Sequence, residues 1–233
     1  MKTFSEYNNS NDFGSIRESV SRQYTLFPND KDELKLMIKK EIKEQGNDAD
    51  LNHIDVSKIN DFSNLFMYTE FNGNISDWDV SNAVTMKAMF AGTNFDGDIS
   101  GWNVSNVEDM SFMFDNNNSF DIDISSWDVS KVRNMDGMFR CTTAFNQDLS
   151  GWDVSNVTSM RSMFENAESF NQDLSGWDVS NVTNMKYMFK DARSFNQDIS
   201  GWDVSNVEYY PDMFKDCRCP EWCKPNFNYV NII

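Results

Sequence analysis

Aspartates are the residues of this sequence whose spacing could support chemistry. They recur in two series, in which each member lies 24 or 25 residues after the previous one. If equivalent residues of successive repeats stack, each series becomes a column with neighbours about 4.8 Å apart. The first series is Asp55, Asp79, Asn103, Asp128, Asp153, Asp178 and Asp203, and the second is Asp98, Asp123, Asp148, Asp173 and Asp198.

Three interpretations of the aspartate columns remain open, because like charges at that spacing repel and need compensation. The carboxylates can accept backbone N–H groups in turns, as aspartate often does. They can form a docking face for the lysines and arginines of a basic protein. They can also hold a ladder of calcium ions, but calcium takes six to eight oxygen ligands. The glycine-rich nonapeptide repeat typical of such ladders is absent from the sequence.

The other candidate reactive residues give little indication of catalysis. Cys217, Cys219 and Cys223 are closely spaced, but a structural zinc site takes four ligands and the sequence offers no fourth nearby. A disulfide and simple packing are the alternatives. His53 is the only histidine, and it has no adjacent motif. No nucleotide-binding, metalloprotease or nucleophile-elbow motif is present. We therefore predict no enzyme activity, no catalytic residue, no metal and no cofactor.

The aspartates belong to a repeat that extends over most of the chain. Near copies of the segment 170–189 recur with a period of about 25 residues, and the tryptophans mark them. A period in this range is typical of arrays in which each unit buries its apolar face against its neighbours. These tryptophans are Trp78, Trp102, Trp127, Trp152, Trp177 and Trp202.

The apolar residues of one copy predict two short elements. Leu149, Trp152 and Val154 have the spacing of a leucine-rich-repeat strand, with Trp152 and Val154 on one face. Met160, Met163 and Phe164 lie at positions i, i+3 and i+4, which favours one helical or 3₁₀ turn. The predicted fold class is an α/β repeat solenoid with short parallel strands, short helical turns and an N-terminal helical cap.

The repeats divide the chain into four parts. Residues 1–29 form a polar N-terminal arm, and 30–50 an amphipathic capping helix with Asp30 as its N-cap. Residues 51–214 hold about seven repeats of 24–25 residues, and 215–233 form a C-terminal cap whose last residues are apolar enough to add a final strand.

The charge of the chain restricts its partners. The net charge is −17, and residues 51–233 carry 27 acidic and 12 basic residues, a net charge of −15. Such a surface repels nucleic acid and anionic membranes and attracts basic proteins or cations, although solubility alone can also explain it.

No apolar run approaches the roughly 20 residues that span a bilayer, and no signal peptide is seen. We expect a cytoplasmic protein, with the cell surface as the alternative.

Specificity is expected at positions that vary between copies. Two variable residues separate the two methionines of each repeat, and aromatic side chains there would be exposed and suited to anchor an interface. Ordinary surface variation is the competing interpretation. The predicted partner-binding residues are Asp79, Asp128, Asp148, Asp153, Asp173, Asp178, Asp198 and Asp203, with Phe112, Tyr187, Tyr209 and Tyr210.

The repeat Phe-Asn-Gln-Asp-Leu/Ile-Ser-Gly-Trp-Asp-Val-Ser-Asn-Val-Thr-x-Met-x-x-Met-Phe closely resembles the BspA-like leucine-rich repeats, which also occur as mycoplasma lipoprotein-type repeats. The resemblance covers about residues 51–214. It implies a right-handed solenoid that binds proteins, often as a bacterial surface adhesin, and no catalytic residues.

Two functions are expected from these observations. The first is an intracellular acidic protein, encoded by a phage or mobile element, that binds and masks a basic, nucleic-acid-handling partner such as a defence nuclease. The second is a surface adhesin for host or partner-cell proteins. Neither function involves direct binding of nucleic acid or insertion into a membrane.

Overall fold

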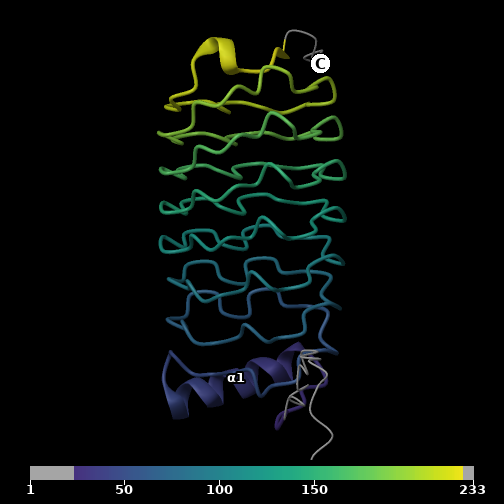
Figure 1. Ribbon diagram of the computed structural model, residues 1–233, viewed down its shortest axis with the longest axis vertical. Coiled ribbons are helices and arrows are strands. Elements are labelled where there is room, and N and C mark those ends of the chain that lie inside the picture. The colour runs from purple at the N-terminus through teal and green to yellow at the C-terminus, as the bar shows by residue number, and fades with distance from the viewer. Residues whose placement is uncertain (1–23, 228–233) are drawn as a thin grey trace, which may run out of the picture.

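The computed structural model describes residues 24–227 as a stack of flat coils (Figure 1). Helix α1, Lys31–Gln45, lies across the N-terminal end of the stack, and the 3₁₀ helix η1, Glu221–Cys223, lies at the C-terminal end. The predicted N-terminal arm up to residue 23 lies outside the described residues, as do residues 228–233 of the final strand predicted over 226–233. Residues 226 and 227 are described and form no strand.

The expected α/β class is wrong. Within residues 24–227, α1 and η1 are the only helices, and successive coils are joined through isolated bridges instead of a sheet of named strands. Those bridges are parallel, and most of them form one series along the stack, through Asp61, Thr85, Asp109, Asn134, Ser159, Asn184 and Tyr209. Leu26–Ile54 and Asp50–Asn74 are two further bridges near the N-terminal end. The segments predicted as strands form no strand, and those predicted as short helical turns form no helix.

The backbone around the methionines explains why no helical turn forms. Ser162 has a φ of 56°, in the left-handed region, which interrupts a right-handed helix. Its N–H donates to Lys186 O of the next coil at 2.8 Å, whereas the N–H of Met163 closes a local turn on Met160 O at 3.2 Å. Alternate N–H groups therefore serve the next coil and the local turn, and the bonds between coils replace helical bonds.

Helix α1 packs its apolar stripe against the first coil. The side chain of Asp30 accepts the N–H of Glu33 at 2.9 Å, which caps the helix N-terminus. Leu34 and Ile38 are buried in the same hydrophobic cluster as the coils. Lys31 Nζ lies 3.1 Å from Asp61 in the first coil, so an ion pair also holds the helix there.

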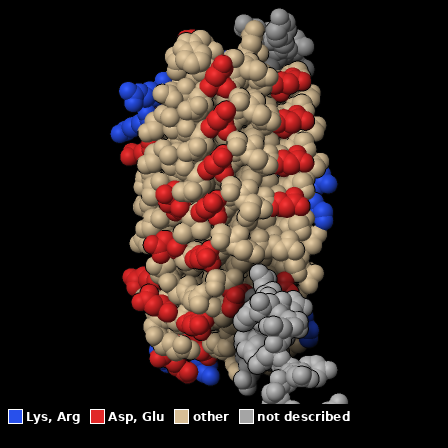
Figure 2. All heavy atoms as spheres, viewed as in Figure 1, with Lys and Arg blue, Asp and Glu red and all other residues tan. Residues whose placement is uncertain are grey.

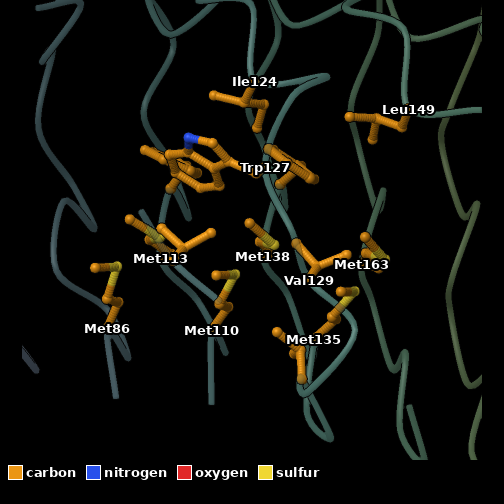
Figure 3. Packing of buried hydrophobic residues seen from close by; sticks show 14 of the residues in the cluster. Met86, Met110, Met113, Ile124, Trp127, Val129, Met135, Met138, Leu149 and Met163 are labelled. Carbon is orange, nitrogen blue, oxygen red and sulfur yellow. The ribbon is translucent and has the colours of Figure 1, made fainter. Parts of the chain in front are cut away.

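The interior of the stack consists of columns of identical side chains. Figure 3 shows the methionines in two rows, with Met113, Met138 and Met163 in one of them. Phenylalanine rings stack in the same way, with 5.8 Å between the ring centroids of Phe90 and Phe114. Each coil alone would expose these side chains, so burial depends on both neighbouring coils.

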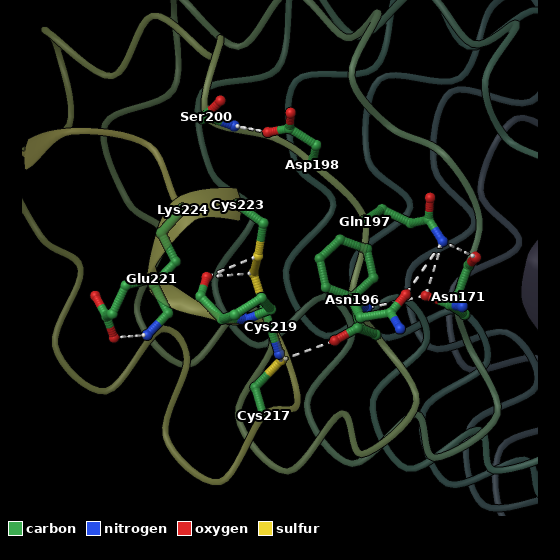
Figure 4. Close-up of a disulfide and its surroundings, with 12 residues drawn as sticks. Asn171, Asn196, Gln197, Asp198, Ser200, Cys217, Cys219, Glu221, Cys223 and Lys224 are labelled. Atoms are coloured by element: carbon green, nitrogen blue, oxygen red, sulfur yellow. Dashed lines mark hydrogen bonds and ion pairs between the residues drawn. A yellow bond between two sulfur atoms is a disulfide. The ribbon is translucent and has the colours of Figure 1, made fainter.

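The chain after the last repeat covers part of the C-terminal end. Cys219 and Cys223 form a disulfide at η1 (Figure 4). The main-chain oxygen of Cys223 accepts the N–H of Ile199 at 3.0 Å, so the loop is attached to the last coil. Cys217 remains a free, half-buried thiol 3.6 Å from Phe195 O.

Candidate protein-binding surface

The two aspartate series lie on the outer surface of the stack, and each carboxylate closes a turn. Figure 2 shows acidic side chains in rows that run along the stack. Asp128 Oδ1 accepts the N–H of Ser130 at 3.0 Å, and Asp148 Oδ1 accepts the N–H of Ser150 at 2.8 Å. The same bond to the serine two residues later is made by Asp79, Asp98, Asp123, Asp153, Asp173, Asp178, Asp198 and Asp203.

Hydrogen bonds from serine lower the pKa of seven of these carboxylates. The hydroxyl and the backbone N–H of Ser130 hold the pKa of Asp128 below its usual value. The corresponding serines lower the pKa of Asp98, Asp123, Asp173, Asp178, Asp198 and Asp203. Local turn geometry therefore stabilises the negative charge at the surface.

Neighbouring carboxylates within a column repel one another. The charge of Asp203 acts to raise the pKa of Asp178, and the charge of Asp173 acts to raise that of Asp198. In both residues the bonds from serine outweigh this repulsion. The columns therefore present closely spaced, ionised carboxylates to solvent, an arrangement that attracts cationic groups.

Asn103 shows that the turn does not need the charge. Its Oδ1 accepts the N–H of Ser105 at 3.2 Å, in the same place and with the same function as the aspartates. A neutral amide oxygen is thus sufficient for folding at this position. The negative charge at the other positions of the column is not required by the turn itself.

The predicted aromatic contacts are mostly less accessible than expected. Tyr209 is exposed, but Phe112, Tyr187 and Tyr210 are half-buried. Tyr210 stacks against Phe227 with 4.0 Å between the ring centroids, so it belongs to the C-terminal cap. The expectation that all four are exposed anchors is therefore wrong for three of them.

Packing between neighbouring coils explains the partial burial of Phe112. Its ring lies over Gly137 of the next coil, where an added Cβ would be only 2.5 Å from the ring. The φ of Phe112 is 57°, which turns the side chain along the stack instead of outward. The missing side chain of Gly137 thus provides the space that the ring occupies.

A group of cations beside Tyr187 was not anticipated from the sequence. Lys186 Nζ lies 4.4 Å from the ring centroid of Tyr187 and 5.4 Å from that of Tyr209. Lys190 Nζ lies 5.3 Å from the Tyr187 ring and forms an ion pair of 2.7 Å with Glu165. The lysines and tyrosines occur in neighbouring variable positions, but their contact depends on the positive φ of Tyr187, which residue type does not reveal.

The cysteines and the histidine form no metal centre. Within residues 24–227, no three His, Cys, Asp or Glu side chains come together in a way that could hold a metal ion. His53 is half-buried, with Nε2 3.4 Å from Glu41 of α1. Its contact links the first coil to the helix.

One known protein family has a sequence model that matches the repeats of this chain. The model of the family described as "Mycoplasma protein of unknown function, DUF285" matches residues 33–152 and, in a second overlapping match, residues 117–222. The chain belongs to this family. The DUF285 matches extend from α1 into the C-terminal cap and so include both aspartate columns. No curated protein and no solved structure matches the chain.

The described part of the chain has no membrane-spanning helix. Helix α1 and η1 are its only helices, and neither has the length and apolar character to cross a bilayer.

Proposed function

We propose that the protein is a non-enzymatic binder that uses its aspartate columns to engage a basic protein. The observation that carries this proposal is the pair of columns of exposed carboxylates, each of which accepts the N–H of the serine two residues later. A column of anions at regular spacing resembles the charge pattern of a nucleic-acid backbone. The partner we infer is a nucleic-acid-handling protein, such as a defence nuclease, whose basic surface the stack would mask in the cytoplasm.

The persistence of charge supports binding over a purely structural function. Asn103 closes its turn without a charge, yet the other positions of its column carry aspartate. Repulsion between neighbouring carboxylates opposes this alignment of charge, and solubility does not need it. A docking face for lysine and arginine explains both the charge and its arrangement.

The test is affinity purification with a variant that removes charge and keeps the turns. Asp128, Asp153, Asp178 and Asp203 are changed together to Asn, which the chain already tolerates at Asn103. We expect the wild-type chain to capture a basic partner at low salt and to release it at high salt. The variant should capture at least about tenfold less, because several ion pairs of a few tenths to 1 kcal/mol each are lost.

A matched control removes four acidic residues outside the columns. Asp96→Asn, Asp121→Asn, Glu108→Thr and Glu208→Thr install residues that other copies carry at the same positions, such as Asn146 and Thr158. This control should retain the partner if the columns bind it. Equal loss in both variants would show a general charge effect, and capture that resists high salt would contradict the electrostatic proposal.

The disulfide favours a second candidate function. Cys219 and Cys223 form a disulfide, and disulfides persist mainly in oxidising compartments. We propose as the alternative that the repeats are of the BspA-like type and act in a surface adhesin that binds host or partner-cell proteins. Cell fractionation separates the two: a protein found only in cytosol, with Cys219 and Cys223 reduced, would exclude the adhesin.

A further inference from the structure

Each coil donates a row of backbone hydrogen bonds to the coil that follows it. The donors are alternate N–H groups near the methionines, and every one of them points toward the C-terminal end of the stack. In one coil the N–H groups of Met160, Ser162, Phe164 and Asn166 donate to the oxygens of Asn184, Lys186, Met188 and Lys190, at 3.0, 2.8, 2.9 and 2.7 Å.

The last coil has the same row of donors but no coil beyond it. Tyr210, Asp212, Phe214 and Asp216 occupy these positions, and within residues 24–227 none of their N–H groups meets an acceptor. The disulfide loop covers the neighbouring part of the coil, where Ile199 donates to Cys223, but it leaves this row open. A row of unpaired backbone donors is a template for another chain.

A hollow of about 770 Å³ lies at this row, lined by residues 210–215 and by Glu221, Lys224 and Phe227 among others. Phe214 is part of its wall and is half-buried, whereas Phe189 in the previous coil is fully buried. The two rings stack with 5.7 Å between centroids, so Phe214 is the last ring of its column. The end therefore offers both backbone donors and apolar surface.

We propose that this end binds a segment of a different protein that adopts the same run of turns as the coils and so adds one more parallel row of carbonyl oxygens to the stack. The donors require acceptors at every second residue, which a segment with the turns of the coils supplies, as residues 159–166 do for the coil before them. The Phe214 ring is half-buried, with Lys224 Nζ 5.4 Å from its centroid. An aromatic residue in the segment, at the position that Phe189 and Phe214 occupy in theirs, would continue the column of rings. This is backbone recognition by addition to an edge.

A second copy of this chain fits less well. The same end of a second copy presents donors, so the two ends cannot pair. The opposite end of the stack is covered by α1, through buried Leu34 and Ile38 and the ion pair of Lys31 with Asp61.

Charge indicates that this site differs from the aspartate columns. The acidic residues of the lining, Asp212 and Glu221, are balanced by Lys215 and Lys224, and Lys224 pairs with Glu221 at 2.5 Å. The hollow is neutral on a chain with a net charge of −17. Binding there should depend little on salt, in contrast to binding at the columns.

The test uses a synthetic peptide that copies residues 159–166 with both ends blocked. This segment carries one arginine and one glutamate, so it has no net charge. In the stack its oxygens at Ser159, Arg161, Met163 and Glu165 accept the row of donors from the coil before it. A peptide of the same composition in scrambled order is the control.

Amide hydrogen exchange of the full chain, followed by NMR, gives a readout at the proposed donors. We expect exchange at Tyr210, Asp212, Phe214 and Asp216 to be fast in the free protein and to slow by about tenfold or more with saturating peptide. The slowing should persist at 0.5 M salt, where charges are screened over about 5 Å or less, because the hollow is neutral. The scrambled peptide should leave these amides unchanged.

A substitution at the ring checks the apolar part of the proposal. Phe214→Leu should weaken peptide binding by about fivefold, the value of one aromatic pair. Trp222→Leu, at an exposed position outside the lining, should not weaken it.

Three results would overturn the proposal. The first is exchange that the peptide does not slow. The second is slow exchange in the free protein that is independent of concentration, because a segment of the chain itself would then occupy the row. The third is slow exchange that appears only at high protein concentration, because a second copy would then be the occupant.

Discussion

The indole N–H of Trp152 donates a hydrogen bond of 3.2 Å to the main-chain oxygen of Ile124, one coil earlier in the stack. The same bond is repeated from every tryptophan of the repeat to the preceding coil, at Trp78, Trp102, Trp127, Trp177 and Trp202. Each of these rings is almost completely buried. The tryptophan therefore fills the interior and also pairs a carbonyl that water cannot reach.

Trp152→Phe should destabilise the stack more than the small change in volume suggests. The phenyl ring retains most of the packing, but the Ile124 oxygen loses its partner, which costs about 1–3 kcal/mol. Chemical denaturation followed by circular dichroism measures the effect. The same substitution at exposed Trp222 is the control and should change stability by less than about 0.5 kcal/mol. Equal effects at the two sites would contradict the role of the hydrogen bond.

Gly137→Ala should be destabilising because of the ring above it. Gly137 has a φ of 57°, and an added Cβ would lie 2.5 Å from the Phe112 ring. Left-handed backbone and overpacking each cost about 1–3 kcal/mol. Gly151→Ala is the matched control, since a Cβ there meets nothing within 4 Å. Thermal unfolding should show a lower Tm for the first variant only.

A double substitution separates the two costs at Gly137. Phe112→Ala removes the ring that the new Cβ meets, so the penalty of Gly137→Ala should be smaller in that background by about 1 kcal/mol or more. Strict additivity of the two changes would show that backbone strain alone is responsible. Ala88 and Ser162 have positive φ at the equivalent positions, which indicates that the stack tolerates the backbone conformation itself.

The apolar framework could be predicted from the sequence, whereas its hydrogen bonding could not. Trp152, Met160 and Phe164 are all buried, because a strict period of apolar residues is directly visible in the sequence. The same spacing does not distinguish a helical turn from consecutive turns with positive φ at every fourth residue, as at Ser162 and Asn166. Phe112 and Tyr187 adopt such φ values although residue type disfavours them, because bonds to the next coil compensate.

The position of the aspartates on the surface could be predicted from the sequence, whereas the burial of the aromatic residues could not. The aspartate series is regular, so its alignment on the outside follows from the period. The burial of Phe112 and Tyr210 was not predictable, since it depends on contacts with Gly137 of the next coil and with Phe227 of the terminal loop. The open donors at the C-terminal end are backbone groups, and no side-chain pattern marks them.

The stability of the stack should fall as the pH is lowered toward the pKa values of the column aspartates. Serine hydrogen bonds lower the folded-state pKa of Asp128, Asp178 and Asp203. Their contribution is therefore complete above the unfolded-state pKa of about 3.9 and is lost as the pH falls through the lower folded-state values. The triple change of these residues to Asn should flatten the dependence of Tm on pH below about pH 5. Identical slopes for both proteins would contradict this prediction.

The two free thiols should react slowly in the folded protein. Burial raises the pKa of Cys141 and of Cys217, so little thiolate forms at neutral pH, and the thiolate is the nucleophile. Alkylation with iodoacetamide at pH 7, followed by mass spectrometry, should label both at least about tenfold more slowly in the folded than in the unfolded chain. Cys219 and Cys223 should be labelled only after reduction, because they form a disulfide. Rapid labelling of Cys217 in the folded protein would show that the terminal loop opens and exposes the cysteine that it covers.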